Sequence, residues 1–358
     1  MNKIYTKTAI NIIDTLYEKG DVSDKALLQL LSFLEEQDKE EQIAEYLFEK
    51  ARAVAKKHYG NKVFSRGLIE ISNYCRNNCY YCGIRAGNGN VSRYRLSKEE
   101  ILECCRKGYE IGFRTFVLQG GEDSYYTDEM VCSIVSQIKE EFTDCAVTLS
   151  LGERSYESYR KLYEAGADRY LLRHETACRE HYSSLHPESM SFKQRMDCLI
   201  NLKKIGYQTG CGIMVGSPGQ TLEHLVKDLR FMKDFKPHMV GIGPFLSQKD
   251  TPFAKEQSGS VMQTLYLLAI IRLMLPTVLL PATTALGTAA ADGREKGILA
   301  GANVVMPNLS PLNVRDKYTL YDNKLATGAE AAESWAELSD KLKVIGYELA
   351  VDRGDWKL

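Results

Sequence analysis

The amino-acid sequence predicts an α/β fold, in the form of a (β/α)8 barrel of the TIM type. The chain has 358 residues, 44% of them hydrophobic, which is enough for a large core. From residue 66 onwards, short apolar or β-branched runs alternate with amphipathic helical stretches, a pattern typical of a parallel sheet. Eight such runs favour a closed barrel, with a six-stranded open barrel as the alternative.

The predicted strands and helices alternate throughout this part of the chain. Strands are expected at 68–72, 115–119, 146–151, 170–173, 210–215, 239–243, 278–284 and 303–307. Helices are expected at 97–111, 127–141, 155–166, 191–206, 221–234, 260–275 and 288–300. Ser97 and Glu100 are spaced as a capping box, and Gly112, Gly166 and Gly206 stand where helices should end.

Helical segments are predicted on both sides of the barrel. Apolar residues recur at three- and four-residue spacing in the first 60 residues, and Ser23 is placed to cap a helix there. We therefore divide the chain into an N-terminal helical extension (1–60), the barrel (61–325) and a C-terminal helical tail (326–358). The tail contains a predicted helix at 329–344.

Composition argues against nucleic-acid and membrane partners. The 46 basic and 47 acidic residues give a formal net charge of −1, and they form no basic stripe. Residues 1–19 lack the apolar core of a signal peptide. The apolar stretch 264–280 is interrupted by Arg272 and Pro276 and is too broken to span a bilayer. We expect a cytoplasmic protein, in which closely spaced cysteines indicate metal binding or catalysis rather than disulfides.

A cysteine motif follows directly after the first predicted strand. Cys75, Cys79 and Cys82 form a C-x3-C-x2-C loop, whose thiolates can hold a [4Fe-4S] cluster and leave one iron without a protein ligand. An open iron can chelate the amino and carboxylate groups of S-adenosylmethionine (SAM). Reduction of the cluster then cleaves SAM to methionine and a 5′-deoxyadenosyl radical. Zinc ribbons instead pair two C-x2-C units, and the sequence contains no second unit.

Glycines and hydroxyl groups mark the ends of two other predicted strands. Gly120 and Gly121 let the backbone approach a ligand closely, and Glu122 beside them can accept hydrogen bonds from the ammonium group of SAM. A tight turn between strand and helix is the structural alternative. Thr283 and Thr284 end the seventh strand, where they can line an anion pocket, although Thr284 can equally cap a helix.

Charged residues follow the fourth predicted strand. Arg173, His174 and Glu175 come directly after an apolar run, and Arg195 begins the next helix. Arginine can clamp a carboxylate through two hydrogen bonds, and Glu175 can hold a ribose hydroxyl or an ammonium group. The alternatives are a buried structural histidine at position 174 and a surface salt bridge at Arg195.

Longer strings around these motifs resemble one family of enzymes. The cysteine triad, with the aromatic Tyr81 before its last cysteine, resembles the radical SAM superfamily. The stretch from 71 to 311 resembles the HydE maturases of iron-iron (FeFe) hydrogenases. The strings that carry this resemblance include QGGEDSYY at 119–126, RYLLRHET at 169–176, MVGSPGQT at 214–221 and PATTALGT at 281–288.

The resemblance implies a full barrel with a [4Fe-4S] cluster and SAM at its top. It implies SAM contacts from Tyr81, Gly120, Gly121, Glu122, Glu175, Arg195 and Met239, and a substrate-side anion pocket of Thr148, Arg173, Thr283 and Thr284. The implied role is assembly of the di-iron subcluster of the hydrogenase H-cluster. The implied substrate is a cysteine-bound iron carbonyl cyanide unit delivered by a partner maturase. An electron donor such as ferredoxin or flavodoxin is also expected.

One departure from the family bears on the number of clusters. Some members carry additional cysteines near the C-terminus that bind a second cluster, whereas the last cysteine here is Cys211. We therefore expect one [4Fe-4S] cluster, and we interpret the seven cysteines outside the triad as small core residues.

Three other functions are weighed against the maturase. Biotin synthase needs cluster-binding cysteines inside the barrel, where Thr148 and Thr283 are poor ligands for iron. Methylornithine synthase should carry an acid placed for the substrate amine, whereas this mouth is rich in threonine and arginine. A non-catalytic iron–sulfur carrier is the alternative from another class.

Overall fold

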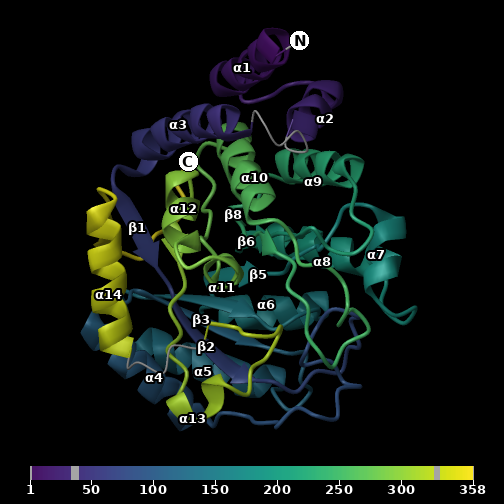
Figure 1. Cartoon of the computed structure of the whole chain (residues 1–358). Coiled ribbons are helices and arrows are strands. Elements are labelled where there is room, and N and C mark those ends of the chain that lie inside the picture. Colours follow the sequence, from purple (N-terminus) through teal and green to yellow (C-terminus); the bar gives the residue numbers. More distant parts are fainter. Residues whose placement is uncertain (1, 34–39, 326–330, 358) are drawn as a thin grey trace.

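Six parallel strands form the main sheet of the computed structural model, which describes residues 2–33, 40–325 and 331–357 (Figure 1). Their order in the sheet follows the chain, and each neighbouring pair is parallel. They are β2 (Gly67–Ser72), β3 (Thr115–Gly120), β4 (Ala146–Ser150), β5 (Arg169–Leu171), β6 (Gln208–Cys211) and β8 (Met239–Val240).

Short parallel β-bridges close this sheet into a ring. They join Met239 to Leu279, Pro281 to Val304 of β10 (Val304–Val305), and Asn308 to Leu68. The predicted (β/α)8 barrel is therefore confirmed, although the predicted strand 278–284 is only a bridged segment. It ends early because Thr283, and not Thr284 as the sequence suggested, caps helix α11 (Thr284–Ala289).

Two predicted strands, 210–215 and 239–243, each break at a glycine. A Cβ on Gly212 would lie 1.9 Å from the carbonyl oxygen of Gly241, so the two backbones touch where no side chain fits. Beyond the break, β7 (Met214–Val215) and β9 (Gly243–Pro244) pair in parallel as a separate two-stranded ladder. The two segments keep the register of β6 and β8, and Ile213 still forms a parallel bridge with Glu175, so only the regular pairing is interrupted at the glycines.

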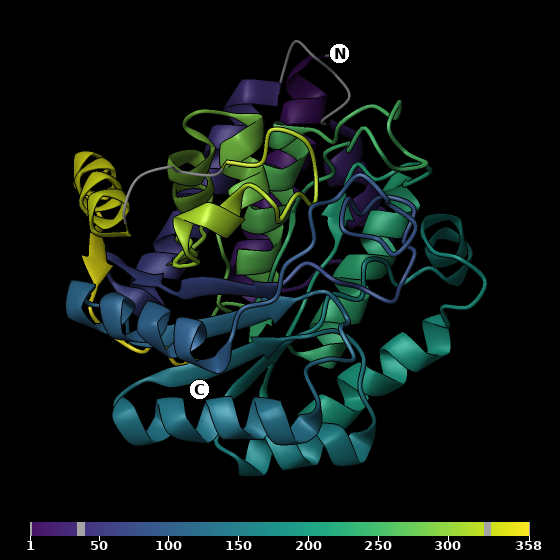
Figure 2. The ribbon, with the colours of Figure 1, turned by 90° about the horizontal axis from the view of Figure 1, so that it is seen from below.

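Helices cover the outer face of the strands (Figure 2). They are α4 (Lys98–Ile111), α5 (Asp128–Glu141), α6 (Tyr156–Glu164), α8 (Phe192–Ile205), α9 (Leu222–Phe235), α10 (Val261–Met274) and α12 (Gly293–Leu299). The capping box of Ser97 and Glu100 is confirmed, as are the caps at Gly112 and Gly206. Gly166 lies one residue beyond the cap of α6 and has a φ of 108°.

Some helices differ from the sequence-based prediction. The helix expected at 288–300 is divided between α11 and α12, with a break at Asp292. Helices α7 (Arg179–Leu185) and α13 (Leu312–Arg315) were not predicted, because each is too short to show a helical repeat of apolar residues.

The two ends of the chain pack against the barrel from outside. Helices α1 (Asn2–Lys19), α2 (Asp24–Ser32) and α3 (Glu40–Tyr59) lie at the end of the molecule nearest α9 and α10 in Figure 1. Strand β1 (Lys62–Ser65) pairs with β10 and with β11 (Glu348–Ala350), which follows α14 (Ala331–Val344). Strand β11 was not predicted in the tail, and the predicted tail boundary at 326 lies outside the described residues.

Arg272, the charge that interrupts the apolar stretch, is a fully buried residue of α10. Its guanidinium donates hydrogen bonds to the carbonyl oxygens of Gly301, Pro276 and Val278 and to Oδ1 of Asn303. Burial lowers its pKa to about 10. It therefore ties α10 to the two segments that close the barrel. Within the described ranges, no helix has the length and apolarity needed to cross a bilayer.

Replacing this guanidinium should destabilise the barrel. In Arg272→Met, buried carbonyl oxygens lose their donor, at a cost of roughly 1–3 kcal/mol each. We expect the free energy of unfolding to fall by about 3 kcal/mol or more, as measured by denaturant unfolding. Arg160→Met is the control, because Arg160 forms only exposed ion pairs, which contribute about 0–1 kcal/mol. Equal losses in the two variants would contradict this role of Arg272.

Candidate functional site

The three cysteines of the triad line one cavity of about 300 Å³ at the mouth of the barrel. The same cavity is lined by residues from the carboxyl ends of β3, β4 and β5, which is where barrel enzymes place their active sites. Of the residues that the sequence singled out, the cavity brings together Cys75, Cys79, Tyr81, Cys82, Gly120, Gly121, Glu122, Arg173, Glu175, Arg195 and Thr283.

The glycine turn after β3 supports the cysteine loop. A Cβ on Gly121 would lie 2.2 Å from the carbonyl oxygen of Tyr74 and 2.7 Å from Cβ of Cys75, so only glycine fits there. The backbone N–H of Arg76 donates to the carbonyl oxygen of Glu122 at 3.0 Å. On the opposite side, the loop after α7 contacts the cysteine loop, with Met190 Sδ 3.6 Å from Cys79 Sγ.

The donor set of the cavity fits an iron–sulfur cluster. Burial raises the pKa of the thiols of Cys75, Cys79 and Cys82, that of Cys82 to about 12, so a metal must displace their protons, as coordinated cations do. In the described part of the chain, no three His, Cys, Asp or Glu side chains lie close enough together to hold a single metal ion. In a [4Fe-4S] cluster, each thiolate binds a different iron, so three thiols spread around a cavity can hold three irons and leave the fourth open.

Glu175 and Arg173 face the cavity with unused hydrogen-bonding capacity. Their side chains form an ion pair, with Glu175 Oε2 3.1 Å from Arg173 Nη2. The geometry is not that of a hydrogen bond, and both atoms are buried without a hydrogen-bond partner. Buried polar atoms are normally satisfied, so unpaired atoms at a cavity wall indicate a place for a polar ligand.

Arg195 is buried rather than exposed. Its Nε lies 2.6 Å from Oε1 of Glu153, and its Nη1 donates to the carbonyl oxygen of Arg173 at 2.7 Å. The ion pair anticipated as an alternative is therefore present, but it lies in the wall of the cavity and not on the surface. Among the described hydrogen bonds, none is made by Nη2 of the guanidinium, so this nitrogen can donate to a carboxylate ligand.

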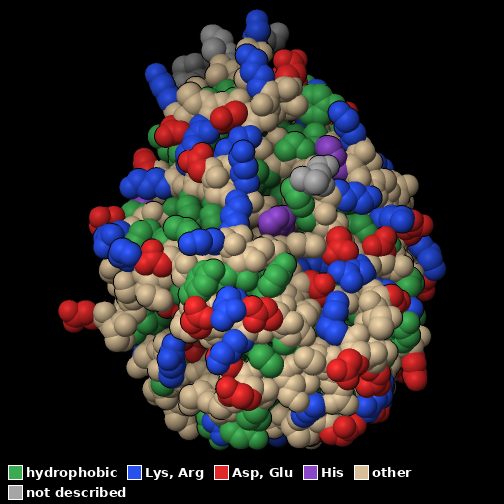
Figure 3. Space-filling model, turned by 180° about the vertical axis from the view of Figure 1, so that it is seen from behind, with side chains coloured by type: hydrophobic (Ala, Val, Ile, Leu, Met, Phe, Trp, Pro, Cys, Tyr) green, Lys and Arg blue, Asp and Glu red, His purple; other side chains and the backbone are tan. Residues whose placement is uncertain are grey.

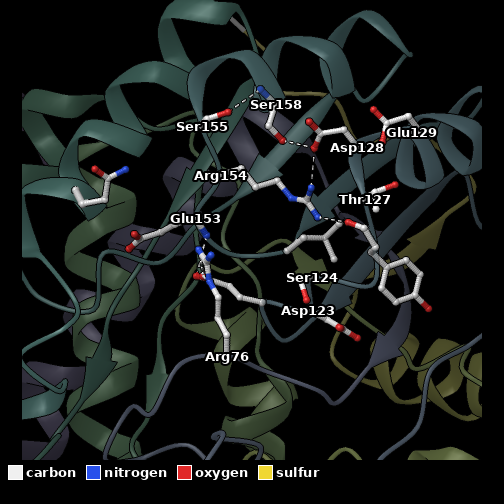
Figure 4. Close-up of a pocket in the computed structure, with 14 residues that line it drawn as sticks. Arg76, Asp123, Ser124, Thr127, Asp128, Glu129, Glu153, Arg154, Ser155 and Ser158 are labelled. Atoms are coloured by element: carbon white, nitrogen blue, oxygen red, sulfur yellow. Dashed lines mark hydrogen bonds and ion pairs between the residues drawn. The ribbon is translucent and has the colours of Figure 1, made fainter.

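Glu122 lines both this cavity and a second, more polar one of about 690 Å³. Figure 4 shows the second cavity. Its Oε1 accepts a hydrogen bond from the backbone N–H of Glu153, and its Oε2 accepts one from Arg76. In Figure 4, Arg154 and Ser158 both point toward Asp128, at 2.9 Å in the case of Arg154. The charged groups of this second cavity thus largely pair with one another, and it contains no cysteine.

Three predicted site residues do not line the cavity. Met239 lies in the barrel interior, where its sulfur accepts a hydrogen bond from Arg66. Thr148 is buried on β4, two residues before Ser150, which does line the cavity, so Thr148 faces the same side one layer deeper. Thr284 is the first residue of α11 and lines a different cavity.

Some residues of the site were not found from the sequence. Glu153 follows β4 and pairs with Arg195, and its signal was an acidic residue directly after a predicted strand. Tyr318, Leu320 and Tyr321 reach the mouth from the loop after the last barrel position. That loop has no regular pattern, and only its aromatic residues could have drawn attention.

Charges of both signs lie interspersed on the face shown in Figure 3. Lysine and arginine side chains alternate there with aspartate and glutamate, and neither sign dominates that face.

Comparison with known proteins agrees with the geometry. The Radical SAM superfamily profile matches residues 69–232. The [FeFe] hydrogenase maturase subunit HydE of Thermotoga maritima is 49% identical over 281 residues, which cover 78% of this chain and 80% of that protein. A 3-methylornithine synthase of Methanosarcina acetivorans is 33% identical, over 91% of this chain and 90% of that protein. A crystal structure of methylornithine synthase (PylB) has a TM-score of 0.81 and 29% identity, and the match covers 95% of this chain and 97% of that one.

Membership of the radical SAM superfamily implies a [4Fe-4S] cluster and SAM. The relatives differ in their sequence identity to this chain. The identity to the hydrogenase maturase, 49%, is well above the 33% of the methylornithine synthase. The chain is a radical SAM enzyme, and it belongs to the HydE family of [FeFe]-hydrogenase maturases.

Proposed function

We propose that this enzyme cleaves SAM reductively and acts in the assembly of the di-iron subcluster of the FeFe-hydrogenase H-cluster. The main support for this proposal is that the cysteine triad, Glu175 and Arg195 line one cavity. The chain is also 49% identical to a HydE maturase. When bound at Cys75, Cys79 and Cys82, the cluster supplies the electron that breaks the sulfonium bond of SAM.

The protein side chains bind and orient SAM. The remaining donor of the Arg195 guanidinium, Nη2, suits the carboxylate of the methionine moiety. Oε2 of Glu175 forms an ion pair with Arg173 but accepts no hydrogen bond, so it suits an ammonium or a ribose hydroxyl. Phe245, Leu320 and Tyr318 add apolar surface around the mouth, which helps to keep water away from a reactive radical.

The substrate side of the cavity supports an anionic substrate. Arg173, which is ion-paired with Glu175, brings two guanidinium nitrogens without a hydrogen-bond partner. Thr148, one layer deeper on β4, has a buried hydroxyl with no hydrogen-bond partner. These donors suit a small organometallic anion such as a cysteine-bound iron carbonyl cyanide unit. We propose that another hydrogenase maturase delivers this substrate in a transient contact, and that a ferredoxin or flavodoxin supplies the electron.

We propose a single cluster for this polypeptide. Six of the cysteines outside the triad are buried in helices, strands and loops, with Cys104 and Cys105 adjacent on α4, and Cys132 is half-buried on α5. Such positions are typical of cysteines that serve as small apolar residues.

The proposed reaction is tested by anaerobic reconstitution followed by addition of dithionite and SAM. We expect 5′-deoxyadenosine to form, and apo-hydrogenase to become active when the enzyme is combined with its partner maturases. A lysine mutase is the second candidate, because a methylornithine synthase matches 91% of the chain. Formation of methylornithine from lysine would establish that candidate and overturn the maturase. An intact cluster without SAM cleavage would instead indicate an iron–sulfur carrier.

Cys79→Ala should abolish the visible absorbance of the reconstituted cluster and lower the bound iron and sulfide, because the triad loses one thiolate ligand. Cys132→Ala is the matched control, since Cys132 lies on α5 outside the cavity. A reconstituted Cys79→Ala protein with an unchanged spectrum would refute the assignment of the triad.

Thr148→Val should separate substrate turnover from SAM cleavage. The two side chains have nearly the same shape, and the hydroxyl that is lost has no hydrogen-bond partner, so stability should stay the same or rise slightly. We expect 5′-deoxyadenosine to form at the normal rate and hydrogenase maturation to fall several-fold. Thr264→Val, which removes a buried hydroxyl from α10, is the control and should leave maturation intact. Normal maturation by Thr148→Val would exclude a role for Thr148 in substrate binding.

A further inference from the structure

Glu175 has a backbone conformation that its residue type does not favour. Its φ is 66°, in the left-handed region. Among the described residues other than glycine, only Lys236 and Asn323 share such a φ. Lys236 ends helix α9, where this conformation is common, and asparagine tolerates it. Glu175 has neither explanation, and such strain costs about 1–3 kcal/mol, so its surroundings must hold it in place.

The first part of this support is the backbone of Gly212, next to β6. The N–H of Glu175 donates to the carbonyl oxygen of Gly212 at 3.0 Å. The N–H of Gly212 in turn donates to Nδ1 of His174 at 3.3 Å. Gly212 itself cannot shift easily, since it packs directly against the carbonyl oxygen of Gly241. His174 and Glu175 therefore bind the N–H and the carbonyl oxygen of the same glycine, respectively.

The second part is a buried aspartate on α9. Because Nδ1 of His174 accepts a hydrogen bond, its proton must be on Nε2 in the neutral ring. Nε2 lies 3.5 Å from Oδ1 of Asp228 without the geometry of a hydrogen bond, so this contact is electrostatic. The same Oδ1 accepts a hydrogen bond from the backbone N–H of Ala177. His174 and Asp228 are both completely buried, and the ring of Phe231 packs against the imidazole at 4.6 Å. Asp228 thus contacts the chain on both sides of Glu175.

This support explains how the Glu175 carboxylate is kept available. The left-handed turn directs the side chain toward the cavity, where Oε2 has no hydrogen-bond partner. We propose that Asp228 and His174 are positioning residues that hold Glu175 in its left-handed conformation and so preset its carboxylate for SAM. The inference rests on the proposed function, since it concerns the SAM site of that reaction.

Asp228→Asn tests the role of Asp228. An amide oxygen at the Oδ1 position can still face the N–H of Ala177 and the ring of His174, but it carries no negative charge. The buried amide N–H2 takes the position of Oδ2, where it has no hydrogen-bond partner. We expect the affinity for SAM to fall on the order of tenfold, which corresponds to about 1.4 kcal/mol of lost positioning. Affinity is measured by calorimetric titration of the reconstituted protein, and the KM for SAM should rise more than kcat falls.

The matched control is Asp234→Asn, which makes the same change at an exposed position of the same helix and should bind SAM normally. If Asp228→Asn does not fold, His174→Asn replaces it. Its side-chain amide can keep the contact with Gly212 and loses the one with Asp228. Normal SAM affinity in a folded, cluster-loaded variant would overturn the inference.

A double-mutant cycle separates positioning from general damage. If Asp228 acts through Glu175, then Asp228→Asn should weaken SAM binding little further in a Glu175→Gln background. Equal losses in both backgrounds would overturn the inference, because Asp228 would then support the fold and not this carboxylate. Failure of the wild-type protein to bind SAM would instead overturn the proposed function, so the two failures are distinguishable.

Discussion

The contact between Gly212 and Gly241 is the constraint on which the site depends. The two backbones meet there without room for a side chain, and the regular pairing of β6 with β8 is interrupted at this point. The chain beyond them turns into the β7–β9 ladder, and Met214, Gly243 and Pro244 from this ladder form part of the cavity wall. The same glycine contact fixes the peptide that His174 and Glu175 hold. One close approach thus precedes a part of the cavity wall and fixes the glycine that Glu175 contacts.

Electrostatics at the mouth follow from the cost of burying charge. A buried charge must be paired or it destabilises the fold, and here Glu153 pairs with Arg195 while Arg173 pairs with Glu175. Neither pair uses all its hydrogen-bonding atoms, so a zwitterionic ligand such as SAM can add to both without breaking either. The two ion pairs therefore stabilise the buried charges, and their remaining hydrogen-bonding atoms can still bind a polar ligand.

The sequence was sufficient to predict the barrel and the location of its chemistry. Long alternating segments such as β3 and α4 carry a clear period, and motifs after strands must gather at one end of a parallel barrel. The sequence did not predict that the seventh barrel position pairs through single bridges only. It also did not predict the partners of β1, which come from distant parts of the chain. A segment of two or three residues has no period to detect.

The direction of individual side chains was also beyond the sequence, and the adjacent Thr283 and Thr284 show why. The hydroxyl of Thr283 accepts from the backbone N–H of Leu286 and so starts α11, while Thr283 still lines the cavity. Once the helix begins, each residue turns by about 100°, and Thr284 lines another cavity. Which threonine lines the cavity of the cysteine triad is thus decided by the exact start of a helix, and the boundaries of helices are the least predictable part of a sequence-based assignment. At strand ends, where barrel enzymes keep their chemistry, a shift of one residue changes which groups can act.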